Sequence, residues 1–404
     1  MRVYLDFLRK PYAARLLGGT LLGRLPNGMA ALAIVLFVRA HGGGYTLSGV
    51  LSAVNGLAVA AGQPVLGRAM DRYGQPRILA SAATASAAGF ALLAAFGGRS
   101  PVVATAAVVL AGFAMPPLEA GLRALWPSVL NGPAEVQAAY ALDAAAQELL
   151  FTVGPLLVVA AAIVSTETAL LLTGALGIAG TLVVTTSRPS RVWRGEPGGG
   201  HWAGPLRSPG MRVLIASLSC VGVSLGVFSV AAVAYADARH TSYASGLLLA
   251  LMSGGALIGG ITYGLRPRTG PAYRRLVLLM ACLAAGYVPL TWAPGFPVMP
   301  VLAIVSGLFL APVLACVFTL VDDLAPRGTV TEAFAWLVTA FAVGSSAGAA
   351  LAGLAGDAGG VHAAFAVAGA GGVLAFLVIL LAGPAGGLAA AAVHEPEVAG
   401  PVSR

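Results

Sequence analysis

The sequence predicts an all-α integral membrane protein, with twelve transmembrane helices in two pseudo-symmetric six-helix bundles. Two observations predict this fold class: the scarcity of charge and the long apolar runs that recur along the chain. Of the 404 residues, 58% are hydrophobic and only 9% are charged, whereas charged residues make up about 25% of a soluble domain. A surface with so few charges needs lipid around it, which excludes a water-soluble globular protein.

The spans can be located from the apolar runs, because a helix needs about 20 residues to cross the hydrocarbon core. Charges and turn residues separate the runs, as in HGGGY at 41–45 and NGPAE at 131–135. The first run is too long for the apolar part of a signal peptide, so we expect it to be retained as a helix. The predicted spans are 16–38, 46–67, 77–97, 101–122, 138–162, 166–186, 212–236, 243–265, 274–293, 297–320, 331–355 and 361–382.

The basic residues predict the orientation in the cytoplasmic (plasma) membrane. Almost all of the 23 lysines and arginines lie in the N-terminal segment, in alternate connections and in the C-terminal segment. The other connections hold only Arg39, Arg99 and Arg239, and Arg24 lies inside the first span. By the positive-inside rule, both termini are therefore expected in the cytoplasm. This distribution also explains the net charge of +8 without nucleic acid.

A Gly-, Pro- and Arg-rich stretch between the sixth and seventh spans divides the chain into two halves. Shifting the chain by about 194–198 residues superposes parts of the halves, with Gly67 over Gly264 and Gly154 over Gly348. Such a repeat is typical of transporter folds. We expect an N-terminal six-helix bundle over 1–186, a cytoplasmic linker over 187–211, a C-terminal six-helix bundle over 212–382 and a disordered cytoplasmic tail over 383–404.

One short motif carries a family resemblance. Residues 67–79, GRAMDRYGQPRIL, resemble the signature of the major facilitator superfamily, roughly G-x-L-a-D-R-x-G-R-[KR]. The resemblance implies a monomeric transporter without a cofactor, which moves a small solute by alternating access. The matching positions are Gly67, Asp71, Arg72 and Gly74, with Gln75 and Pro76 in place of basic residues and Arg77 one position late.

The resemblance also implies a role for Asp71, because the matching aspartate of the family holds the two halves shut on the cytoplasmic side. We expect Asp71 to face the start of the eleventh span near Thr329, with Arg123 as a candidate ion-pair partner. The alternative is that these charges only anchor a solvated loop. The sequence TVTE at 329–332 fits a capping box, so Glu332 is expected to cap its own helix.

Ionisable residues inside the spans are few, and such residues are costly and usually functional. They are Arg24, Glu119, Asp143 and Glu148. Glu148 lies deepest in the predicted spans, so we expect it either to carry a coupling proton or to form an ion pair with Arg24. Asp143 is expected near headgroup water, and Glu119 is expected to pair with Arg123, four residues on, at the surface.

Other polar residues of the spans are candidates for the substrate cavity, or alternatively for hydrogen bonds between helices. These are Asn27, Asn55, Gln63 and Gln147. Gly154 and Pro155 resemble the core of the pattern G-x-x-x-G-P-x-x-G-G of drug:proton antiporters, although Leu150 and Val158 stand at positions where the pattern has glycines.

The function that these observations favour is proton-coupled efflux of small amphipathic compounds, with protons as the coupling ion and the lipid bilayer as the surroundings. An importer or facilitator of a small metabolite on the same fold is the alternative. A membrane sensor or enzyme is more remote, since the five histidines are scattered and the three cysteines show no metal or disulfide spacing. No metal site and no nucleic-acid partner are expected.

Overall fold

The computed structural model describes residues 10–195, 203–241, 244–265, 270–295, 298–382 and Leu388, apart from the side chains of Tyr45, Thr46 and Glu148. The regular structure in this part of the chain is helical, and eleven helical segments are long and apolar enough to cross a membrane. One of them, α15 (Val330–Ala382), is two helices joined at the non-helical Gly359 and Gly360. The prediction of an all-helical membrane protein with twelve spans is confirmed.

Six spans form the first half of the chain. The span Pro101–Val129 is broken between two shorter helices, where Pro116 and Pro117 supply no backbone donor for a continuous helix. The elements of this half are α2 (Ala13–Ala40), α3 (Tyr45–Tyr73), α4 (Gln75–Phe96), η1 (Gly97–Arg99), α5 (Pro101–Phe113), α6 (Leu118–Val129), α7 (Pro133–Ala162) and α8 (Thr166–Thr185).

The second half follows the short helices α9 (Arg188–Val192) and η2 (Gly204–Arg207), which lie in the predicted linker. Residues 196–202 of that linker, and the predicted tail from 383 onward except Leu388, lie outside the described residues. The elements of the second half are α10 (Pro209–Ala238), α11 (Ala244–Gly264), α12 (Ala272–Tyr287), η3 (Val288–Trp292), α13 (Val298–Leu308), α14 (Leu310–Leu324) and α15.

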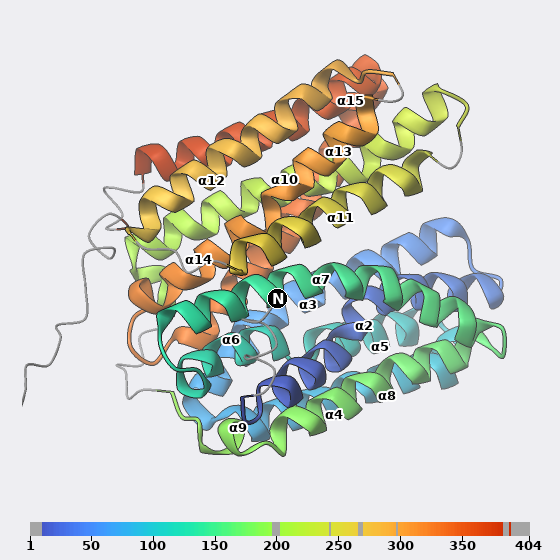
Figure 1. The fold of residues 1–404 in the computed structure, drawn as a ribbon. Helices are drawn as coiled ribbons and strands as arrows, with labels where there is room; N and C mark the ends of the chain where they lie inside the picture. Colours follow the sequence, from blue (N-terminus) through green and yellow to red (C-terminus); the bar gives the residue numbers. More distant parts are fainter. Residues whose placement is uncertain are drawn as a thin grey trace, which may run out of the picture.

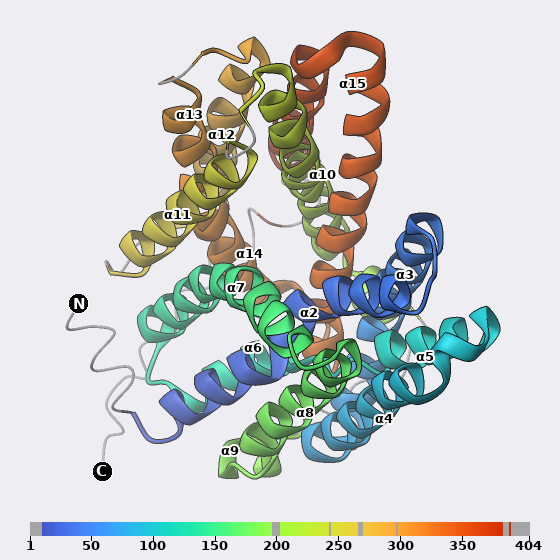
Figure 2. The ribbon, with the colours of Figure 1, turned by 90° about the vertical axis from the view of Figure 1, so that its right-hand side faces the viewer.

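The helices from each half gather in a layer of their own (Figures 1 and 2). Glycines allow close approach within each layer, as at Gly180 of α8 against Gly23 of α2 and Gly348 of α15 against Val223 of α10. Without a hydrophobic driving force between helices in lipid, this close backbone packing supplies much of the attraction. The layers meet where α3 and α6 contact α15 and where α7 contacts α11 and α14.

Two helix boundaries differ from the predicted ones in ways that affect function. Helix α3 continues to Tyr73, so Gly67, Asp71 and Arg72 lie in its last turns rather than in a loop, and Gly74 alone separates α3 from α4. Gly74 has a φ of 87°, which suits glycine. Helix α7 begins at Pro133 instead of 138, so each of its residues lies five positions further from the start of the helix than predicted.

Candidate substrate cavity, charge network and latch

A cavity of about 740 Å³ lies between the two halves. Helices α2, α3, α6 and α7 of the first half and α10, α11, α14 and α15 of the second contribute its lining. The volume lies within the range of about 300–1,000 Å³ that is usual for small-molecule sites. A cavity at the interface of two structural repeats is also where secondary transporters bind their substrates.

The two walls of this cavity differ in chemistry. The first half contributes the charged and amide side chains of the lining, and the second half contributes leucines, phenylalanines and a few serines. The charged and amide side chains are Arg24, Asn27, Asn55, Glu119, Arg123 and Gln147, and the large apolar ones of the facing wall include Leu218, Leu225, Leu249, Leu314, Leu337 and Phe341.

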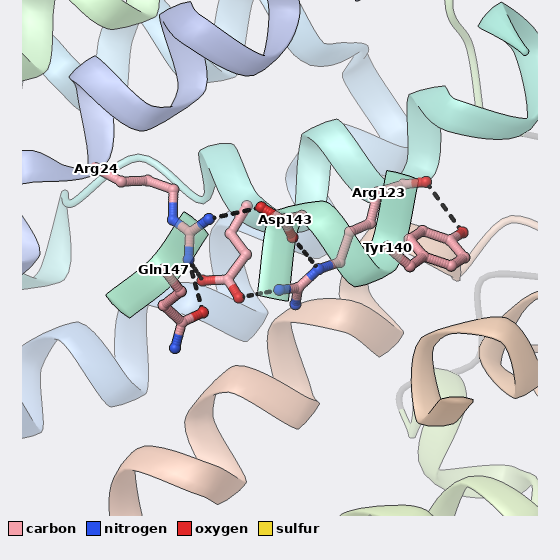
Figure 3. Close-up of polar contacts among 6 residues, drawn as sticks. Arg24, Arg123, Tyr140, Asp143 and Gln147 are labelled. Carbon is pink, nitrogen blue, oxygen red and sulfur yellow. Dashed lines mark hydrogen bonds and ion pairs between the residues drawn. The ribbon is translucent and has the colours of Figure 1, made fainter. Parts of the chain in front are cut away.

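The charged side chains belong to a buried network of two arginines and two carboxylates on α2, α6 and α7 (Figure 3). Asp143 accepts from Arg24 Nη1 at 2.9 Å through Oδ1 and from Arg123 Nε at 2.8 Å through Oδ2. Glu119 bridges the same two arginines, with 2.7 Å between its Oε2 and Arg24 Nη2 and a contact between its Oε1 and Arg123 Nη2. Gln147 accepts from Arg24 Nη2 through Oε1 at 2.9 Å. We call these five side chains the charge network.

The charge network is neutral when all four of its ionisable groups are charged. Arg24 is 3% exposed, and Arg123 and Asp143 are fully buried. Moving such charges out of water costs several kcal/mol per ion, and good pairing geometry offsets this cost. The balance of its four charges therefore supports the burial of the network.

The charge network reaches across to the second half. The Arg123 guanidinium lies 3.5 Å from the centroid of the Phe318 ring on α14, a geometry that favours cation–π attraction. Beside it, the Tyr140 hydroxyl on α7 donates to Asp322 Oδ2 on α14 at 2.9 Å. One contact of the network and one of the neighbouring Tyr140 thus join the first half to α14.

A second set of contacts closes the end of the molecule that carries the linker. Asp71 on α3 accepts from the backbone N–H groups of Thr331 and Glu332 through its two oxygens, at 3.0 and 2.9 Å. Arg68 donates to both oxygens of Glu332, at 2.9 and 2.6 Å. We call Arg68, Asp71, Thr331 and Glu332 the latch. An anion at a helix N-terminus satisfies free N–H groups and the helix dipole.

The latch contains the contact that was expected for Asp71, at the start of the eleventh span. Two related expectations are wrong. Arg123 binds Glu119 and Asp143 instead of Asp71. The first turn of α15 is capped by Asp71 from another helix, while the Glu332 side chain binds Arg68.

The exposure predicted for two acids is also wrong. Asp143 has no exposed surface and lies about ten residues into α7, or ~15 Å at 1.5 Å per residue. Glu119 does pair with Arg123, but the pair is buried rather than at the surface. Arg24 binds these two acids and Gln147. The Glu148 side chain lies outside the described residues, so its predicted roles stay untested.

The remaining predicted residues are distributed between the cavity and the helix interfaces. Asn27 and Asn55 line the cavity, and Asn55 Nδ2 also donates to the Val108 carbonyl at 2.9 Å. Gln63 Nε2 donates to the Met115 carbonyl at 3.2 Å. Gly154 packs against Gly28 of α2, and Pro155 follows it within α7. Gly67 packs against Ala335 of α15. The side chains of Arg72 and Arg77 are exposed.

Sequence reasoning missed four residues of these contacts: Arg68, Tyr140, Phe318 and Asp322. No signal within their own spans distinguishes Phe318 or Tyr140 from lipid-facing aromatics. Arg68 and Asp322 lie close to span ends, where charges are ordinary. Their partners lie on the other half, so only the packed helices reveal them.

The fold and the cavity between its halves define the class of the protein: a polytopic helical transporter of small solutes, and not an enzyme. A family model described as Major Facilitator Superfamily matches residues 16–298. The chain belongs to this superfamily, whose members are secondary transporters.

Solved structures agree on the fold. The human organic anion transporter MFSD10 (TETRAN) is 17% identical, with a TM-score of 0.66 over 92% of this chain and 100% of that one. A bacterial homologue of the iron transporter ferroportin, in an outward-facing state, is 15% identical, with a TM-score of 0.73 over 92% of this chain and 99% of that one. No curated protein sequence matches this chain.

Proposed function

We propose that this protein exports small amphipathic compounds from the cytoplasm across the plasma membrane, as a monomer that is driven by inward movement of protons. The observation that carries the proposal is a cavity whose charged and amide side chains all come from the first half, while the second half lines it with mainly apolar side chains. An amphipathic solute can place its polar group against the charge network and its apolar body against the leucines of the second half. Burial of that body is favourable at roughly 25 cal/mol per Å² of apolar surface.

The proton coupling rests on the charge network. Glu119 lines the cavity, so a proton can reach it from the cavity without crossing packed helices. A proton on Glu119 weakens its bonds to Arg24 and Arg123 and leaves the network with an unbalanced positive charge. The contact between Arg123 and Phe318 on the second half is then expected to change. Glu148, the carrier predicted from sequence, is the second candidate for the proton site.

The arrangement of the halves supports an outward-facing state. The latch closes the end that carries the linker, and the basic residues favour a cytoplasmic linker. The bacterial ferroportin homologue of similar fold is described in the same state. Binding of protons from outside to an outward-facing cavity is the step that a proton-driven exporter requires.

The test uses inverted membrane vesicles, in which efflux becomes uptake. An imposed proton gradient should drive uptake of a fluorescent amphipathic probe by the wild type. Glu119→Gln should remove the dependence on the gradient, because a neutral amide cannot carry the proton. Glu148→Gln is measured beside it, and Glu167→Gln at the surface of α8 serves as the control. Uptake that is equal with and without a gradient would refute proton coupling.

Import of a small polar metabolite is the second candidate function. The observation in its favour is the set of amide groups on the polar wall, Asn27, Asn55 and Gln147, which suit a hydrogen-bonding solute. Right-side-out vesicles distinguish the two functions. An importer accumulates its substrate there with the gradient, and an exporter does not.

A further inference from the structure

The linker between the two halves touches the latch at both of its described ends. The backbone of Gly195 packs on the Asp71 carbonyl, so that a Cβ atom at 195 would overlap that carbonyl. The backbone of Gly204 packs on the Glu332 side chain, and a Cβ atom at 204 would lie 2.6 Å from both carboxylate oxygens. One linker glycine therefore contacts each side of the latch.

The first of these contacts belongs to a well-anchored segment. The Ser190 hydroxyl on α9 donates to Gln75 Oε1 at 3.3 Å, and Gln75 Nε2 donates to the Gly121 carbonyl on α6 at 3.0 Å. Gln75 is fully buried and stands where the family signature has a basic residue. These bonds fix α9 against α4 and α6, and Trp193 packs against the main hydrophobic core. Gly195 is thus held against Asp71 by the preceding residues.

The second contact is equally constrained. Gly204 is buried and has a φ of 47°, a conformation that L side chains rarely adopt. Its helix η2 packs against both α10 and α15. The Glu332 carboxylate is 3% exposed and bound by Arg68, so it has little room to retreat from a side chain at position 204.

We propose that Gly195 and Gly204 are positioning residues of the latch, which let Asp71 and Glu332 make the contacts that stabilise the closed state. Their missing side chains let the linker lie directly on Asp71 and Glu332 and shield the ion pair and the capping bonds. Gly195 packs on a latch residue of the first half and Gly204 on one of the second, so a side chain at either position would displace one partner of the contacts that join the halves. The proposal needs only alternating access and is independent of the direction and the coupling ion of transport.

The test measures the closed fraction in the full-length protein in nanodiscs. Spin labels at Tyr73→Cys and Arg274→Cys, both exposed near the linker end of their helices, report the separation of the halves in a variant whose native cysteines are replaced. Gly204→Ala should lower the ratio of closed to open protein at least fivefold, because the methyl group meets the carboxylate and φ is positive. Gly195→Ala should act in the same direction through Asp71.

A matched control separates the contact from the backbone strain. Gly270 has a φ of 95°, and no atom lies within 4 Å of the position of its Cβ. Gly270→Ala therefore adds strain at a positive φ without touching the latch. It should leave the closed fraction unchanged while thermal unfolding shows its effect on stability.

A rescue variant tests the partner directly. Adding Glu332→Asp to Gly204→Ala keeps a carboxylate for Arg68 but withdraws it by one methylene from the added methyl group. The closed fraction should rise relative to Gly204→Ala alone. The proposal is overturned if Gly195→Ala and Gly204→Ala fold and keep the wild-type ratio, or if Gly270→Ala lowers it equally. It is also overturned if the double variant shows no recovery.

Discussion

Asp143 binds two arginines from different helices without any exposed surface. A carboxylate in this position balances two buried positive charges, and both of its arginine partners line the cavity. Glu119 has the same partners but lines the cavity. The two acids therefore differ in access, and we expect Asp143 to be structural and Glu119 to be responsive to protons and substrate.

Asp143→Asn should lower the stability of the protein strongly. The amide leaves two arginines with a single carboxylate, and removal of one partner from a buried ion pair costs about 3–5 kcal/mol. Thermal unfolding in detergent checks this expectation. The control is Glu167→Gln, which removes the half-exposed contact with His41 and should cost at most about 1 kcal/mol. Equal melting temperatures for the two variants would contradict a structural role of Asp143.

At the scale of elements, the ends and breaks of the helices determine where polar groups lie. Helix α7, which begins at Pro133, brings Asp143 into contact with Arg24 of α2. The extension of α3 to Tyr73 presents Asp71 to the first turn of α15. The two last spans reverse at Gly359 and Gly360, and Gly360 has φ 68° and ψ −163°, which is open almost only to glycine.

Gly360→Ala should destabilise the second half by about 1–3 kcal/mol, because alanine is strained in this backbone conformation. Gly356→Ala is the matched control: it lies four residues earlier in the helical part of α15, where no atom crowds the position of its Cβ. Alanine is favoured over glycine in a helix by up to about 1 kcal/mol, so this control should be neutral or stabilising. Gly360→Ala should lower the melting temperature relative to the wild type, whereas Gly356→Ala should leave it unchanged or raise it. A similar decrease for both variants would argue against backbone strain at the reversal.

At the scale of the whole molecule, the two halves have similar helices but different chemistry. The first half carries the charge network, and the second half contributes mainly apolar side chains to the cavity. The hydrogen bonds that join the halves at the latch and at Tyr140 lie toward the linker end. Solute is therefore expected to enter the cavity from the opposite end.

Cysteine labelling in intact cells tests this arrangement together with the orientation. Ser345 lines the cavity, whereas Ala335 lies on the same helix, fully buried against Gly67 at the latch. A membrane-impermeant maleimide added outside should label Ser345→Cys and leave Ala335→Cys unmodified. Labelling of Ser345→Cys only in inverted vesicles would reverse the proposed orientation or state.

The spans were predictable from the sequence because lipid imposes a local rule: each crossing needs about 20 apolar residues, whatever the neighbouring helices are. The contact of Asp71 was predictable from the motif of residues 67–79, because the matching aspartate of the family signature has a known place between the two halves. The partners of Arg24 were harder to predict, since several acids lie at comparable positions along the predicted spans. The predicted start of α7 at 138 placed Asp143 near headgroup water, whereas the packed helices bury it between Arg24 and Arg123.

The sequence by itself therefore determined that this protein lies in a lipid bilayer, and it determined the twelve spans, the family and the few residues whose charge requires compensation. The tertiary structure decided which charges compensate each other: Asp143 with Arg24 and Arg123, and Asp71 with the first turn of α15. It also decided that Glu332 binds Arg68 instead of capping its own helix. The physical reason is that hydropathy and capping patterns act over a few residues of one chain segment. Ion pairing in a low-dielectric interior depends on the rotation, depth and packing of helices that are far apart in sequence.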